Sequence, residues 1–143
     1  MAYKLFIDTN VYLDYLMNRG KEWQQAENIL ELAENNRIEV FTSASCLLNL
    51  MYVMRSYKLA NTEIVGHVNN ILSYSKLANP DNTIFQTALS VGFPDLEDAV
   101  QYFTALHIKG IDYFITSNTK DYKKASMQLP VITPKQFMGL YNK

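Results

Sequence analysis

The sequence predicts a single α/β domain over residues 1–143, with helices on both faces of a central parallel sheet of about four to five strands. Short apolar runs, such as residues 5–7 and 113–116, alternate with segments of helical periodicity along the whole chain. Strands that alternate with helices in this way form a three-layer α/β/α fold. The 143 residues, of which 48% are hydrophobic, suffice for one domain with a buried core.

The first strand, residues 5–7, ends at Asp8, and Val11 and Leu13 follow it at positions typical of an opening helix. A carboxylate at the carboxyl end of a central parallel strand lies where open α/β sheets hold their sites. Asp8 or Thr9 is equally well explained as the N-cap of the helix. Further into that helix, Asp14 is expected at the solvated surface. This stretch alone leaves both interpretations of Asp8 open.

The middle of the chain contains one predicted strand, residues 38–41, among several helices. An apolar stripe with three- and four-residue spacing predicts a helix that begins near Glu22. Residues 42–45 offer N-cap chemistry for a helix that runs to about Tyr57, and residues 61–63 open another. The segment 84–89 has apolar positions that do not distinguish a helix from a strand. The stripe of the first of these helices consists of Trp23, Ala26, Ile29, Leu30 and Ala33.

The last part of the chain repeats the alternation of helix and strand. A strong helix is predicted over residues 96–108, followed by a strand at 113–116 and a polar turn at 117–122. A short strand at 131–132 and a closing helix at 134–141 complete the chain. Pro134 suits the first turn of that helix, where its missing N–H is not needed.

Composition excludes several classes of protein. The net charge is −1 and the pI is near 6.1, so the chain carries no basic arm for nucleic acid, although a bound metal ion can supply positive charge. The single cysteine, Cys46, cannot form an intramolecular disulfide, and we expect it to be a small core residue. No segment has the length of a membrane span. We therefore expect a cytoplasmic protein with no membrane contact.

Acids and amides gather where the predicted strands end. Because the carboxyl ends of parallel strands share one edge of a sheet, these side chains should lie close together. Converging carboxylates repel one another unless a cation lies between them, and Mg²⁺ or Mn²⁺ suits such oxygen ligands. Water bound to the metal would then attack phosphorus. The residues concerned are Asp8, Asp95, Glu97, Asp98, Asn118 and Asp121.

Each of these acids also has a simpler explanation, and other chemistries find little support. Asp95 is better explained as a helix cap than as a ligand, and a plain turn residue is the simpler alternative for Asp121. His67 and His107 lack a cysteine or histidine at ligand spacing, which argues against zinc. The chain contains no P-loop, no G-x-G-x-x-G and no G-x-S-x-G motif.

Four segments together resemble the PIN domain, the metal-dependent nuclease fold of many prokaryotic toxin ribonucleases. They are F-I-D-T-N-V at residues 6–11, D-L-E-D-A-V-Q-Y at 95–102, I-T-S-N-T-K-D-Y at 115–122 and V-I-T-P-K-Q-F at 131–137. They occur in the order expected for the family and span essentially the whole chain. The first motif is short and weak alone, whereas the series is fairly specific.

The resemblance implies a site in which Asp8, Asp98 and Asp121 hold one or two Mg²⁺ or Mn²⁺ ions. Glu97 would be a possible fourth acid. Asn49 and Asn118 stand at positions where many members carry carboxylates. An amide oxygen can bind a metal or position a water but adds no negative charge. A PIN subgroup shows the same amides, so they are compatible with a subgroup pattern.

The resemblance also implies a function: a metal-dependent endoribonuclease that is the toxin of a toxin–antitoxin pair, with RNA as substrate and an antitoxin protein as partner. Homodimers are common among similar proteins, and helices at residues 23–33 and 64–72 are candidate faces. The alternative is a catalytically weakened PIN-like domain that binds RNA or a protein. A structure-specific DNA nuclease ranks lower, because the chain is too short for the additional arch of such enzymes.

Overall fold

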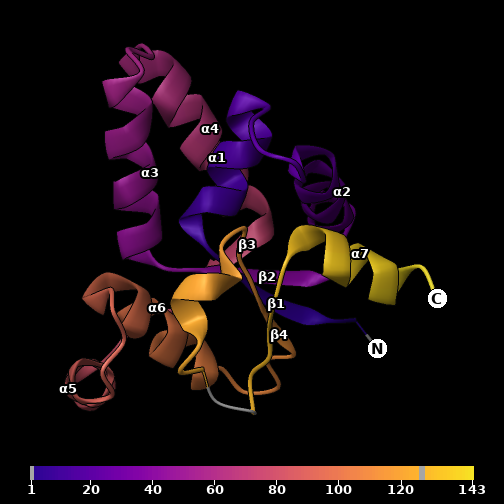
Figure 1. Ribbon diagram of the computed structural model, residues 1–143. Coiled ribbons are helices and arrows are strands. Elements are labelled where there is room, and N and C mark those ends of the chain that lie inside the picture. The colour runs from indigo at the N-terminus through magenta and orange to yellow at the C-terminus, as the bar shows by residue number, and fades with distance from the viewer. Residues whose placement is uncertain (1, 126–127) are drawn as a thin grey trace.

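The computed structural model describes residues 2–125 and 128–143 and contains a parallel sheet of five strands in the order β3-β2-β1-β4-β5 (Figure 1). The strand order reverses between the central pair, β1 and β4, which is the place where open α/β sheets bind their ligands. The strands are β1 (Lys4–Ile7), β2 (Glu39–Thr42), β3 (Ser75–Leu77), β4 (Tyr113–Ile115) and β5 (Val131–Ile132).

Helices cover both faces of the sheet, which confirms the predicted three-layer α/β fold (Figure 1). One face is packed by α1 (Thr9–Met17), α2 (Trp23–Glu34), α3 (Ala44–Ser56), α4 (Asn61–Tyr74) and α7 (Pro134–Tyr141). The other face is packed by α5 (Asn82–Ser90) and α6 (Leu96–Leu106). A 3₁₀ turn, Thr119–Tyr122, follows β4 and returns the chain toward β1.

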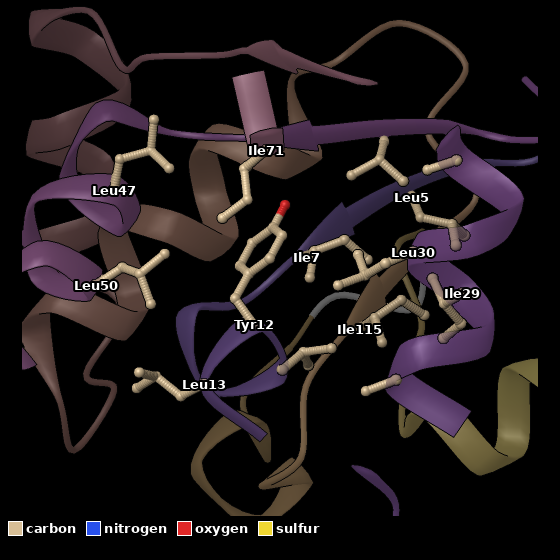
Figure 2. Packing of buried hydrophobic residues seen from close by; sticks show 14 of the residues in the cluster. Leu5, Ile7, Tyr12, Leu13, Ile29, Leu30, Leu47, Leu50, Ile71 and Ile115 are labelled. Atoms are coloured by element: carbon tan, nitrogen blue, oxygen red, sulfur yellow. The ribbon is translucent and has the colours of Figure 1, made fainter. Parts of the chain in front are cut away.

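Alternation along β1 sends its side chains into two separate cores, because successive residues of a strand face opposite sides of the sheet. Leu5 and Ile7 enter the first core, in which Tyr12 lies among aliphatic side chains from the surrounding helices (Figure 2). Phe6 enters the second core. Its ring stacks on that of Phe114 from β4, with 5.3 Å between centroids. Both faces of the central strands are therefore buried and their register is well determined.

The second core is rich in aromatic residues and lies directly beneath the end of β4. Two tyrosine rings pack against the ring of Phe114. The centroid of Tyr122 lies 4.8 Å from that of Phe114, and the centroid of Tyr102 lies 5.6 Å from it. The hydroxyl of Tyr102 donates to the carbonyl of Leu129 at 2.7 Å. Cys46 is buried in this core, as predicted. These contacts hold the 3₁₀ turn and α6 in fixed positions relative to β1.

The structure corrects or completes several predictions from the sequence. The strand that completes the sheet is β3, which was not predicted, and the ambiguous segment 84–89 belongs to helix α5. Asp14 is buried and not at the solvated surface, because its carboxylate accepts from Arg19 Nε at 3.0 Å and from Ser117 Oγ at 2.5 Å. In the apolar stripe of α2, Ala26, Ile29, Leu30 and Ala33 are buried in the first core and Trp23 is half-buried.

None of the helices in the described part of the chain has the length and apolarity that a membrane crossing needs.

Candidate active site

A small polar cavity of about 180 Å³, which we call the acid pocket, opens at the carboxyl ends of β1 and β4. Segments far apart in the sequence form it: the start of α1, one face of α3, the first turns of α6 and the 3₁₀ turn. Five carboxylates line it, those of Asp8, Asp95, Glu97, Asp98 and Asp121. The other lining residues are Thr9, Asn10, Leu13, Asn49 and Gln101.

Asp8 is the buried floor of this pocket and is only 5% exposed. The parallel register places it beside Thr116, whose hydroxyl donates to Asp8 Oδ2 at 3.0 Å. The Tyr122 hydroxyl donates to the same oxygen at 2.9 Å, and the Thr9 N–H donates to Oδ1 at 2.8 Å. Asp8 is the N-cap of α1 and also lines the pocket, so the two interpretations drawn from the sequence describe one residue.

Helix α6 directs three acids toward the pocket from its first turn. Asp95 is the N-cap, and its Oδ1 accepts from the Asp98 N–H at 2.9 Å, which confirms the capping role expected for it. Glu97 and Asp98 follow and both line the pocket. Adjacent residues on a helix are about 100° apart, so both can reach one site only at the helix end, where these two lie.

The electrostatics of the pocket disfavour its negative charge. Burial, and then the charges of Asp8 and Asp95, raise the pKa of Asp98 to about 7. Burial also raises the pKa of Asp8, although the hydrogen bonds from Tyr122, Thr116 and the Thr9 N–H oppose the shift. Burial and the two neighbouring carboxylates push the pKa of Tyr122 far above its usual range, so its hydroxyl remains a donor. A cation in the pocket would relieve this repulsion.

The predicted amides occupy different places. Asn49, from α3, lines the pocket. Asn118 is not among the lining residues. Its Nδ2 donates to Asp121 Oδ2 at 2.7 Å, and its N–H donates to Thr116 Oγ1 at 3.2 Å. Asn118 therefore holds the Asp121 carboxylate without lining the pocket itself. The other five predicted site residues all line the pocket: Asp8, Asn49, Glu97, Asp98 and Asp121.

Sequence reasoning missed several polar residues of the site. Asn10 links the start of α1 to the segment after β4: its Oδ1 accepts from the Ser117 N–H at 3.1 Å and its Nδ2 donates to Thr116 Oγ1 at 3.3 Å. Tyr122 holds Asp8, and nothing in the pattern around it indicated this contact. Gln101 had a usable signal, since it lies four residues after Glu97 and thus on the same face of α6.

The donor set suits a hard divalent cation. Within the described residues, no lysine, arginine or histidine forms an ion pair with any of the five carboxylates. In the same residues, no three acids, histidines or cysteines stand close enough to enclose a metal ion by themselves. Mg²⁺ commonly binds through one or two carboxylates and keeps several waters. A partly hydrated ion therefore fits this pocket better than one enclosed by protein ligands.

The chain matches a protein-family model and is similar in fold to solved structures. The family model of the PIN domain matches residues 4–120. VapBC2 from Rickettsia felis, solved with a promoter DNA fragment, is similar at a TM-score of 0.68 and 16% identity, with 91% of this chain and 98% of that chain covered. A toxin–antitoxin complex from Klebsiella pneumoniae is similar at 0.65 and 22% identity, with 91% and 97% covered. No curated protein matches.

Proposed function

The chain belongs to the PIN domain family, and from this premise we propose that it is a metal-dependent endoribonuclease that hydrolyses RNA phosphodiester bonds at the acid pocket. The observation that carries the proposal is the group of five carboxylates at the strand-order reversal, where the pKa of Asp98 is raised to about 7. Such crowding of acids is unfavourable for stability alone and is typical of a site that binds a cation.

In this proposal Asp8, Asp98 and Asp121 hold a partly hydrated Mg²⁺ or Mn²⁺, directly or through its waters, and Glu97 and Asn49 are further oxygen donors of the pocket. A bound divalent ion would offset the charges of the acids and the phosphate and lower the pKa of a water. Thr116 and Tyr122 keep the Asp8 carboxylate in one orientation through the two hydrogen bonds to Oδ2. Asn118 does the same for Asp121. These supporting bonds maintain the arrangement that the ion requires.

The catalytic claim is tested with Asp8→Asn, because asparagine is as good a helix cap as aspartate and preserves the fold while it removes the charge. Purified protein is assayed on single-stranded and structured RNA with MgCl₂ or MnCl₂. Glu34→Gln, at an exposed position of α2, is the matched control. We expect cleavage that EDTA and Asp8→Asn abolish and that Glu34→Gln preserves. Equal cleavage by Asp8→Asn and the wild type would refute the proposal.

We further propose that the chain is the toxin of a toxin–antitoxin pair, as two of its structural neighbours come from such complexes. Expression of the wild-type chain should arrest bacterial growth, whereas expression of Asp8→Asn should not. Equal growth would argue against the toxin role.

A homodimer is the expected assembly. Of the two faces predicted for it, only α4 keeps exposed apolar residues, Val65 and Leu72. Light scattering should then give twice the chain mass of 16.5 kDa, and Val65→Glu should reduce it to the monomer. A monomeric wild type would contradict this assembly.

A second candidate function, an RNA- or protein-binding module without catalysis, is favoured by Asn49 and Asn118, which replace possible carboxylates. Calorimetric titration with MnCl₂ separates the two functions. Metal binding that Asp98→Ala abolishes supports the nuclease. RNA binding that is indifferent to chelator, together with no metal binding, supports the module.

A further inference from the structure

A second and larger cavity, which we call the apolar pocket, lies beside the acid pocket and is lined by residues of α3, α5 and α6 and of the loop before α5. Its volume is about 530 Å³. Most of its wall is hydrophobic and includes Leu48, Phe85, Leu89 and Leu96, all of which are substantially exposed. Exposed apolar side chains around one concavity indicate a binding surface.

The two pockets share three lining residues, Asn49, Glu97 and Gln101. They therefore form one continuous depression, acidic at one end and apolar at the other. Gln101 lies at the junction and is only 7% exposed. A primary amide is buried at a cost unless its polar atoms find partners, so the position of this glutamine requires an explanation.

Cys46, from α3, provides a partner for the carbonyl oxygen of the Gln101 amide. Its thiol donates to Gln101 Oε1 at 2.9 Å. Burial raises the pKa of Cys46, so the thiol keeps the proton that it donates. The carbonyl of the amide is thus satisfied within the protein. The amide nitrogen has no partner among the described residues and is not one of their fully buried unpaired atoms. Gln101 consequently has an N–H donor available at the junction of the pockets.

We propose that the apolar pocket holds an unpaired base of the RNA next to the scissile phosphate, and that Gln101 donates its amide N–H to an acceptor on that base. The inference rests on the proposed nuclease function and names a subsite of the same substrate. A strand with its phosphate at the acid pocket passes Gln101 and reaches the apolar pocket next. The 46% exposed ring of Phe85 offers a stacking surface, and stacking on aromatic side chains is how proteins hold unstacked bases.

The polar groups of the depression favour a base over an apolar protein segment. Asn49 and Gln101 stand at the junction, and Asn79 and Ser45 also line the apolar pocket. Asn79 Oδ1 and Ser45 Oγ already have partners in Ala44 and Ser43. The side-chain amides of Asn49 and Gln101 match the edges of bases, whereas a purely aliphatic segment would leave them unpaired. A partner segment in this pocket is the outcome that would overturn the inference.

The test measures RNA binding in MnCl₂ by fluorescence anisotropy of a short labelled single-stranded RNA with phosphorothioate linkages, which slow cleavage. The cation then offsets the repulsion between the acid pocket and the phosphates. Gln101→Met keeps the length of the side chain and removes the donor, and Gln101→Glu replaces the donor with an acceptor. Each should weaken binding by about fivefold to tenfold, as expected for one lost hydrogen bond. Gln24→Met, at an exposed position of α2, is the matched control and should bind as the wild type does.

Cys46 supplies a second pair of variants. Cys46→Ser keeps a hydroxyl donor for Gln101 Oε1 and should bind RNA as the wild type does. Cys46→Ala frees the amide to rotate and should weaken binding by about threefold. Melting temperatures, measured in parallel, identify any variant that fails to fold.

A set of RNAs that each lack one base then locates the contact. Removal of one particular base should weaken binding to the wild type and have no further effect on Gln101→Met. Unchanged affinity of both Gln101 variants, or equal effects of every base removal, would overturn the inference, and the pocket would then be left to a partner segment.

The outcomes separate this inference from the proposed function. Cleavage that depends on Asp8, together with unchanged RNA affinity in Gln101→Met, refutes the base subsite alone. Base-dependent binding without cleavage refutes the nuclease alone. A wild-type chain that binds no RNA refutes both.

Discussion

At the scale of single residues, the pocket is organised around the buried carboxylate of Asp8. Three donors hold it, from Thr9, Thr116 and Tyr122. Hydrogen bonds to a carboxylate favour its charged form and partly offset the effect of burial. The hydroxyl of Tyr122 is therefore a supporting group whose removal should affect metal binding more than folding.

The variant Tyr122→Phe tests whether the Tyr122 hydroxyl supports metal binding at Asp8. Without the hydroxyl, the pKa of Asp8 should rise, and a proton should compete better with the metal at neutral pH. We expect the affinity for Mn²⁺ to fall about tenfold, as for other supporting contacts of metal ligands. Calorimetric titration with MnCl₂ measures it, and the defect should diminish at higher pH. Tyr113→Phe is the control because Tyr113 packs at the first core. An unchanged affinity in Tyr122→Phe would contradict this role.

The pKa of Asp98 makes stability depend on pH in a defined direction. Its value rises from the ordinary 3.8 to about 7 on folding, so between these values the folded state binds more protons than the unfolded state. The free energy of unfolding should therefore fall as pH rises through this window, and level off above it. The raised pKa of Asp8 acts in the same direction.

Thermal unfolding of the metal-free protein at about pH 5 and about pH 8 measures this effect. The melting temperature should be lower at the higher pH, and MnCl₂ should restore it there and have little effect at the lower pH. Asp98→Asn should remove most of the difference. Stability that rises with pH over this range in the wild type would show that other groups dominate.

At the scale of elements, helix α6 depends on Asp95 for its beginning. The side chain caps the Asp98 N–H at 2.9 Å and sets the orientation in which the first turn meets the pocket. Asp95→Ala should lower the free energy of unfolding by about 1 kcal/mol, whereas Asp95→Asn should be nearly neutral because asparagine also caps helices.

Urea unfolding of both Asp95 variants distinguishes capping from charge. If the role of Asp95 is only its negative charge near Asp98, the two variants should be equally stable, and the capping prediction fails. Titration with MnCl₂ on Asp95→Asn then reports what this carboxylate contributes to metal binding without disturbing the helix.

The sequence predicts those elements whose signals are local. Helix α7 has the predicted bounds, because Thr133 and Gln136 form a capping box around Pro134. Strand β3 has no such signal. Its three residues, Ser75 to Leu77, carry two exposed side chains, and only pairing with β2 makes them a strand.

The same distinction explains which parts of the site were predictable. Asp8 and Asp98 lie where a parallel topology directs any acid that follows a strand or opens a helix. Asn10 and Tyr122 act through contacts with segments more than a hundred positions away, as the 114-residue separation of Tyr122 from Asp8 shows. Asp14 was wrongly predicted to lie at the solvated surface for the same reason, since its partner Ser117 is 103 positions away. No local pattern encodes such partners.

At the scale of the whole molecule, the two cores meet at the central strands, and the second core supports the pocket. Phe114 is fully buried and contacts the rings of Phe6, Tyr102 and Tyr122. Its ring thus connects β1, α6 and the 3₁₀ turn. Stability and the geometry of the site should therefore be lost together when this residue is truncated.

Phe114→Ala should lower the free energy of unfolding by about 3–5 kcal/mol, a large part of the total for a domain of this size. Urea unfolding followed by circular dichroism measures it. Phe85→Ala, at an exposed position of α5, should cost much less. Comparable losses for both would show that the second core tolerates a cavity beneath β4.

The pairing of β1 with β4 also governs when the chain becomes capable of its proposed activity during synthesis. Asp8 and Thr116 are separated by 108 positions, so the ribosome makes the carboxylate long before its two hydroxyl partners, Thr116 and Tyr122. Until Tyr113–Ile115 emerges, β1 lies at the edge of a growing sheet and its backbone can pair with other chains. The edge of β1 is therefore open to other chains until β4 emerges, and the proposed site is incomplete until the 3₁₀ turn follows a few residues later. One short stretch of synthesis, residues 113–122, ends both conditions.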